Sequence, residues 1–184
     1  MPDPTSNSLT PLLSALGGYL IAAVTQYFRD RRAHAREREA RAEERQLKLF
    51  ERRSDFQRET LLTLQEAIQR LARTAGQMQH HDEMTFRSTG QWGRSLYGEE
   101  ISTANFNAGV QTLIFTSRVR DEKIRELAKT FRTLVMRMVF CKSHDESVAI
   151  MTEAMAVQEP LQGRIGMILR QLDDEDTLEL ERSR

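Results

Sequence analysis

Two short clusters contain the residue types best suited to chemistry. They are His80-His81-Asp82-Glu83 and Cys141-x-x-His144-Asp145-Glu146. Imidazole and carboxylate groups bind divalent metals, so a metal site would form if the two clusters approached each other. Successive residues on a helix point about 100° apart, so His80 and His81 cannot both bind one ion from a regular helix. Helix ends and capping sites explain both clusters without metal, and we predict no cofactor.

Cys141 and His144 are three residues apart, a spacing that brings side chains within reach on one helical turn. The sequence shows no group that would orient the imidazole and no oxyanion hole. Cys141 is the only cysteine, which excludes an internal disulfide, and we interpret it as a small apolar filler. P-loop, GxGxxG and HExxH motifs are absent. We therefore predict that the protein is not an enzyme.

The most distinctive stretch is Leu9 to Phe28, which has no charged residue and is followed at once by Arg29. A helix of about 20 mostly apolar residues is long enough to cross a bilayer. All 27 lysines and arginines lie at or after Arg29, and this bias places basic segments on the cytoplasmic side. The sequence thus predicts a single-pass helix in the inner or cell membrane, with a disordered stub over residues 1–8 outside and the C-terminal domain in the cytoplasm.

Two further features of this segment bear on its role. Ser14, Gly18 and Ala22 are spaced four apart, and small residues so spaced allow close packing of two membrane helices. Leucines of the same stretch also follow a helical stripe, as in an amphipathic helix that covers a soluble core. The alternative to a membrane span is therefore a first helix that packs on the bundle.

Residues 29–46 alternate in charge and contain no glycine or proline, which predicts a solvated helical stalk. Glu37 with Arg41, and Glu44 with Lys48, have the spacing of helix-stabilising ion pairs. The arginines nearest the membrane would contact anionic lipid headgroups; they are Arg29, Arg31, Arg32 and Arg36. Interleaved acids and a formal net charge of zero argue against nucleic acid as a partner.

The composition, with only four prolines and nine glycines, predicts an all-α chain whose residues 47–172 form a three- or four-helix bundle. A heptad seam supports this prediction and indicates coiled-coil packing from about Leu47. Its positions are Leu47, Leu61, Ile68 and Ala75, each followed three residues later by Phe50, Leu64, Leu71 and Met78.

Residues 80–98 interrupt the helical pattern, because glycines, serines and threonines gather there among aromatic residues. The aromatic residues are Phe86, Trp92 and Tyr97. Such a loop either binds a partner or is pinned across one end of the bundle by its own side chains. We favour pinning, and an exposed Trp92 would favour a binding loop.

The remaining helices are predicted from capping residues and apolar spacing. A second helix spans about 99–117, a third begins after the N-cap Asp121, and Ser143 and Glu146 form a capping box for a fourth. The second helix is expected to turn five residues inward: Ile101, Ala104, Val110, Leu113 and Ile114. Pro160 should kink or divide the fourth helix, and residues 173–184 should form a frayed acidic tail.

Three segments give the chain a resemblance to a known group. "RETLLTLQEAIQRLAR" (58–73), "SRVRDEKIREL" (117–127) and "GRIGMILRQL" (163–172) follow the anchor and stalk. The chain resembles small uncharacterised bacterial proteins, frequent in actinobacteria, in which a membrane anchor precedes a cytoplasmic helical domain. No activity is known for the group, so the resemblance implies architecture and location only.

From the sequence we expect a membrane-anchored helical interaction or regulatory protein at the cytoplasmic face. Its expected partners are membrane lipids and either further copies of itself or another protein. Two alternatives remain open: a membrane-active effector of a stress or antiphage response, and a soluble helical bundle with a metal site.

Overall fold

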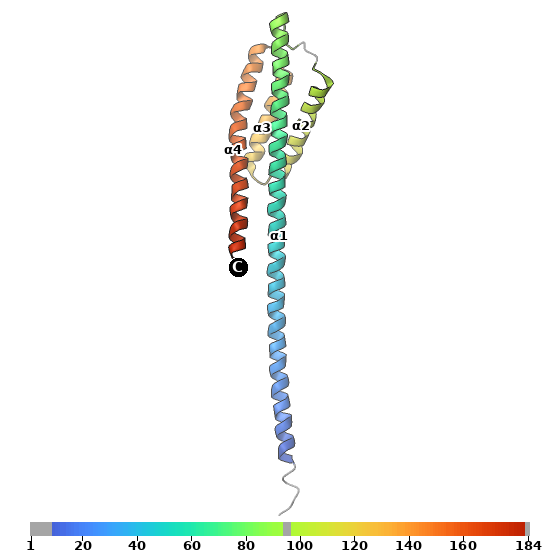
Figure 1. Ribbon diagram of the computed structural model, residues 1–184, viewed down its shortest axis with the longest axis vertical. Coiled ribbons are helices and arrows are strands. Elements are labelled where there is room, and N and C mark those ends of the chain that lie inside the picture. The colour runs from blue at the N-terminus through green and yellow to red at the C-terminus, as the bar shows by residue number, and fades with distance from the viewer. Residues whose placement is uncertain (1–8, 94–96, 183–184) are drawn as a thin grey trace, which may run out of the picture. The chain divides into compact units, whose positions relative to one another are not determined.

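The computed structural model describes residues 9–93 and 97–182, and within them the backbone forms four α-helices (Figure 1). The helices are α1 Leu9–Thr89, α2 Glu99–Arg118, α3 Glu122–Val139 and α4 His144–Arg182. Side chains are described for Gln26, Arg31 and His34, and then over residues 36–93 and 97–178. The predictions of an all-α chain and of a helical bundle are confirmed for these residues. The chain divides after Phe50 into two compact units.

The first unit contains the charged stalk, which forms part of α1. Both predicted ion pairs are present, with 2.5 Å between Glu37 Oε1 and Arg41 Nη2 and 2.6 Å between Glu44 Oε1 and Lys48 Nζ. The hydrogen bond and charge of Lys48 lower the pKa of Glu44. Leu47 and Phe50, which the heptad seam includes, are exposed within this structure.

The second unit is the helical bundle, in which α2, α3 and α4 lie alongside α1 from Glu51 onward (Figure 1). The heptad positions of α1 from Leu61 to Met78 are confirmed as core, because each of these is at most 3% exposed, unlike Leu47 and Phe50. They are Leu61, Leu64, Ile68, Leu71, Ala75 and Met78. The third helix supplies the facing side of the core with six buried side chains: Ile124, Ala128, Phe131, Leu134, Val135 and Met138.

Polar side chains fix the ends of the bundle helices. The Asp121 carboxylate accepts a hydrogen bond from the Ile124 backbone N–H at 2.9 Å, as its predicted N-cap role requires. Its other oxygen lies 2.6 Å from Arg164 Nη2, so it also ties α3 to α4. At the start of α4, Ser143 Oγ accepts from the Glu146 N–H at 3.2 Å, which confirms half of the predicted capping box. The Glu146 carboxylate accepts from the Lys142 N–H at 3.1 Å instead of from the Ser143 N–H.

A buried glutamine explains why the heptad seam of α1 turns polar at Gln57. Its amide nitrogen donates to the Arg118 carbonyl at 3.1 Å, and its Oε1 accepts from the Arg120 N–H at 3.0 Å. The side chain therefore satisfies the backbone where α2 ends and the chain turns toward α3. A leucine at this position would leave those backbone groups without these hydrogen bonds.

Helix α1 extends further than the sequence predicted, because it continues through residues 80–89 instead of ending near His80. Asp82 is buried, and Glu83 and Phe86 are half-buried, so contacts with the rest of the bundle hold these turns in helical form. The predicted irregular backbone begins at Gly90, whose φ is 70°, and Gly93 has a φ of 71°. Both values lie in the left-handed region that glycine adopts readily.

Helix α4 is continuous through Pro160, so the proline does not divide it. Leu161 and Ile165, which follow the proline, are fully buried, and Ala154 before it is 3% exposed. Packing on both sides therefore keeps the helix continuous although the proline removes a backbone donor.

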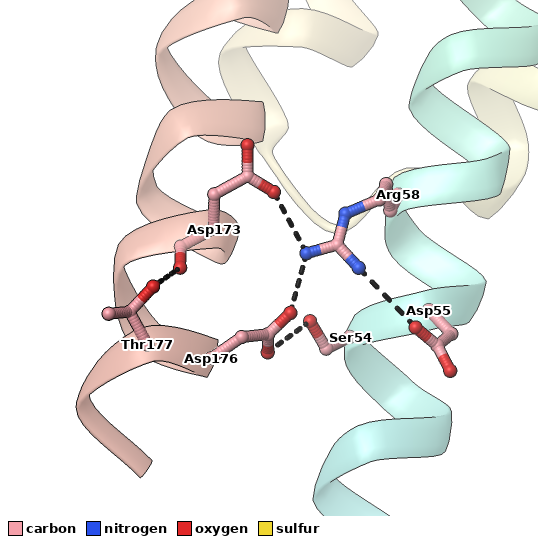
Figure 2. A network of polar contacts seen from close by, with 6 residues as sticks. All are labelled: Ser54, Asp55, Arg58, Asp173, Asp176 and Thr177. Atoms are coloured by element: carbon pink, nitrogen blue, oxygen red, sulfur yellow. Dashed lines mark hydrogen bonds and ion pairs between the residues drawn. The ribbon is translucent and has the colours of Figure 1, made fainter. Parts of the chain in front are cut away.

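The acidic end of α4 is helical to Arg182 instead of frayed. Figure 2 shows the reason: Arg58 of α1 lies between two aspartates of α4, with 2.5 Å to Asp176 Oδ2 and 3.0 Å to Asp173 Oδ1. Asp176 also accepts a hydrogen bond from Ser54 Oγ at 3.1 Å. These carboxylates raise the pKa of Arg58 and keep its guanidinium charged.

Candidate functional site

The two polar clusters of the sequence meet at one end of the bundle. His144 Nε2, at the start of α4, lies 2.7 Å from Glu83 Oε2 near the end of α1. His144 Nδ1 lies 3.2 Å from Asp145 Oδ1. The hydrogen bond to Asp145, with that to Glu83, raises the pKa of His144. Hydrogen bonds from Arg87 and then from His144 lower the pKa of Glu83.

Two aromatic rings pack against the His144 imidazole. The Phe86 ring stacks on the His144 imidazole with 5.2 Å between centroids and an angle of 8° between planes. Trp92 meets both rings edge-on, at 5.9 Å from Phe86 and 5.3 Å from His144. The Trp92 indole N–H also points at Cys141 Sγ, 3.3 Å away. The residues after α1 are thus held against the start of α4.

A second polar pair lies on the same end of the bundle. The Tyr97 hydroxyl donates to Asp82 Oδ2, and Asp82 is only 5% exposed. The other oxygen, Asp82 Oδ1, is buried without a hydrogen-bond partner among the described residues. Burial, and then the hydrogen bond to Asp82, raises the pKa of Tyr97. The His81 ring meets Tyr97 edge-on at 5.8 Å, and both His80 and His81 are exposed.

The three aromatic residues predicted as a partner-binding loop are Phe86, Trp92 and Tyr97, and all are half-buried. Their contacts are those of the pinned loop, which is the interpretation that the sequence favoured.

The polar and aromatic contacts at this end of the bundle join the end of α1 to the start of α4. Glu83 and His144 would supply two ligands to a metal, but the described residues contain no group of three His, Cys, Asp or Glu side chains placed to hold an ion. Both nitrogens of His144 engage carboxylates, and Cys141 is buried against Trp92. Within this geometry the imidazole is not positioned to activate the thiol, because a base must share a hydrogen bond with its nucleophile.

A different feature, on α2, was missed by sequence reasoning. The helix turns four small or polar residues toward the bundle: Asn105, Ala108, Gly109 and Thr112. Three of its larger apolar side chains point outward, with exposed fractions of 66% for Phe106, 37% for Val110 and 52% for Leu113, whereas Phe115 packs against the core. Ile114 is 42% exposed and Ala104 is exposed as well, so the predicted inward face was wrong; only Ile101 is half-buried.

Close packing explains this orientation of α2. A Cβ added to Gly109 would lie 2.8 Å from the terminal methyl of Met136, so α2 approaches α3 closely where Gly109 faces it. The Thr74 hydroxyl of α1 lies 3.0 Å from Asn105 Oδ1, and Thr112 Oγ1 donates to the Ala108 carbonyl at 2.8 Å. The signal in the sequence was the spacing of small and polar residues at 105, 108, 109 and 112.

The sites predicted at the membrane fall largely outside the described side chains. The structure describes no side chains for Ser14, Gly18, Ala22, Arg29 and Arg32, whereas Arg31 and Arg36 are exposed. In the part of the chain that the structure describes, no helix combines the length and apolarity needed to span a bilayer.

No known protein family, curated protein or solved structure matches this chain.

Proposed function

We propose that the chain is a membrane-tethered helical interaction protein, which self-associates at the cytoplasmic face and acts by binding instead of catalysis. The observation that carries the interaction function is the outward face of α2. Phe106, Val110 and Leu113 are presented to solvent by a helix whose four buried residues are small or polar.

Burial of this outward face by a partner would be energetically favourable. Burying a large apolar side chain contributes roughly 1.5–3 kcal/mol relative to leaving it in water. A helix that only covered a bundle would turn Phe106 and Leu113 inward. Because Gly109 and Asn105 hold α2 in the opposite orientation, the apolar side is left for another surface, as contiguous exposed apolar patches commonly are.

The tether is supported by the composition of the first helix. Its segment from Leu9 to Phe28 is uncharged, and the basic residues begin at Arg29. Such a segment is favoured among lipid acyl chains, and the arginines beside it favour the cytoplasmic headgroups. In this proposal Arg31 and Arg36 contact lipid, and Gly18 lies where two membrane helices pack.

The tether is tested by membrane fractionation combined with protease protection of tagged full-length protein. We expect the wild type in the membrane fraction, with a C-terminal tag protected in intact spheroplasts and an N-terminal tag accessible. Leu20→Arg combined with Val24→Arg should move the protein to the supernatant, since each arginine at mid-membrane costs roughly 2.5–3.5 kcal/mol. The matched control replaces the same residues by alanine. Wild type recovered in the supernatant without detergent would refute the tether.

A further inference from the structure

The outward face of α2 has the spacing of a helix-pairing seam. Thr103, Phe106, Val110, Leu113 and Ser117 follow one another at intervals of three and four residues, and all are exposed. This alternation places the five side chains in one stripe along the helix, as at the a and d positions of a coiled coil. The stripe is apolar at its centre and polar at its ends, so it can be covered by one further helix.

We propose that this stripe binds the α2 helix of a second copy in antiparallel orientation, about a twofold axis that crosses α2 near residue 108. Phe106 of each copy then packs beside Val110 of the other, and Thr103 packs beside Leu113. A twofold contact must use the same surface on both copies. Thr103, Phe106, Val110 and Leu113 meet this requirement, because their intervals of three, four and three residues are the same in both directions. This proposal deepens the proposed self-association and rests on it.

Charge complementarity selects the antiparallel arrangement. Glu99 and Glu100 lie in the first turn of α2, and Arg118 lies in its last turn. In the antiparallel pair, the two acids of one copy come beside Arg118 of the other at both ends of the seam. In a parallel pair the acids of both copies would face each other, as would the two arginines, and like charges repel.

The same acids disfavour a lipid surface as the occupant of this face. Glu99 and Glu100 are exposed at one end of the stripe. Anionic headgroups would repel them, whereas headgroup binding uses basic residues around the apolar stripe. A second copy would cover the apolar centre of the stripe and pair with the charged residues at both of its ends.

The size of the contact sets its strength. A helix of 20 residues is about 30 Å long. One pair of such helices covers less than the roughly 800 Å² per partner of a standard stable interface. The isolated contact should therefore be weak, and confinement of both copies to one membrane raises their effective concentration enough to populate the dimer.

Disulfide cross-linking of the full chain tests the geometry in a Cys141→Ala background. Membranes are isolated from cells that co-express two tagged copies and are treated with a thiol oxidant, because the cytoplasm keeps thiols reduced. We expect Thr103→Cys in one copy to cross-link with Leu113→Cys in the other, and Thr103→Cys copies not to cross-link with each other. A parallel pair would give the reverse. Cross-linking of neither combination, or of Thr103→Cys copies alone, would overturn the proposal.

A matched pair of phenylalanines tests the energetics. Phe106→Ser should reduce the Thr103–Leu113 cross-link roughly tenfold, because an apolar anchor at the centre of an interface is lost. Phe140→Ser removes a side chain that is 77% exposed at the end of α3, and it should leave the cross-link unchanged. Equal effects of the two variants would contradict the proposed seam. Circular dichroism checks that both variants fold.

Charge reversal and vesicle binding complete the test. Arg118→Glu should weaken the cross-link, and Glu99→Arg with Glu100→Arg in the same chain should restore it. The proposal would be overturned if the protein bound anionic vesicles, if Phe106→Ser abolished that binding, and if no cross-link formed. Those results would assign the outward face of α2 to lipid. Membrane fractionation tests the tether independently of cross-linking. A protein that fractionates with the membrane but forms no cross-link would refute the α2 pairing and leave the tether standing.

Discussion

His144 Nε2 lies 2.7 Å from Glu83 Oε2, and this contact joins the start of α4 to the last turns of α1. The residues are 61 positions apart in the chain. Phe86 stacks on the imidazole, and Trp92 closes its edge. Both side chains titrate, so the stability that their contact contributes at this end of the bundle should depend on pH.

We expect His144→Gln to destabilise the protein more near pH 5.5 than near pH 8. The raised pKa of His144 means that its charged form stabilises the fold fully below the ordinary imidazole pKa of about 6.5, and that this contribution is lost as pH rises through the folded value. The lowered pKa of Glu83 adds stability above about pH 4.3, lost as pH falls through its folded value. Urea unfolding at both pH values measures the difference. His80→Gln, at an exposed position, is the control, and equal losses for His144→Gln at both pH values would contradict the prediction.

The Arg58 network predicts how the end of α4 responds to mutation and salt. Arg58→Gln should lower the free energy of unfolding by about 1 kcal/mol, because its three partly exposed ion pairs, to Asp55, Asp173 and Asp176, are lost together. Amide hydrogen exchange over residues 173–178 should accelerate. About 1 M salt should shrink the difference between wild type and variant, since it screens the charges. Arg53→Gln, at an exposed position one turn away, should change neither quantity.

The contact between Gly109 and Met136 predicts a double-mutant result. Gly109→Ala should be nearly neutral, because the atom in the way is the flexible end of a methionine, and alanine gains about 1 kcal/mol of helix propensity over glycine. Gly109→Val should destabilise by about 1–3 kcal/mol, as overpacked sites do. Met136→Ala should recover part of that loss. If Gly109→Val destabilises the protein equally with and without Met136→Ala, then the valine clashes with a residue other than Met136.

The elements predicted best are those whose apolar residues face the core. In α3, Ile124, Phe131 and Val135 recur at helical spacing and are buried, and Asp121 caps the helix as expected. The seam of α1 was predicted on the same grounds. Such patterns succeed because burial of large apolar side chains is the dominant favourable term in folding.

The failures have one cause, which is that contacts distant in sequence overrode local patterns. The α2 prediction assumed that Val110 and Leu113 face inward, but the close approach at Gly109 required small residues there. The predicted break at His80 ignored the contact of Glu83 with His144, which no local signal encodes. The predicted fraying of the tail ignored Arg58, more than a hundred residues away.

Tyr97 and Asp82 give the sharpest prediction for the candidate site. Tyr97→Phe removes the hydroxyl that donates to Asp82 Oδ2, and Asp82 Oδ1 already has no partner among the described residues. We expect a loss of about 1–3 kcal/mol at neutral pH, the cost of leaving a buried polar group unpaired. Urea unfolding of the wild type and of Tyr97→Phe measures this loss.

The pH dependence and a second substitution identify the cause of that loss. Because the folded pKa of Tyr97 is raised, its contribution is fully present below the ordinary tyrosine pKa of about 10 and is lost as pH rises through the folded value. The gap between wild type and Tyr97→Phe should therefore narrow above about pH 10. Asp82→Asn added to Tyr97→Phe should recover part of the neutral-pH loss, since a neutral amide is less costly to bury than an unpaired carboxylate. If the double variant is less stable than Tyr97→Phe alone, then the loss in Tyr97→Phe does not come from leaving the Asp82 carboxylate unpaired.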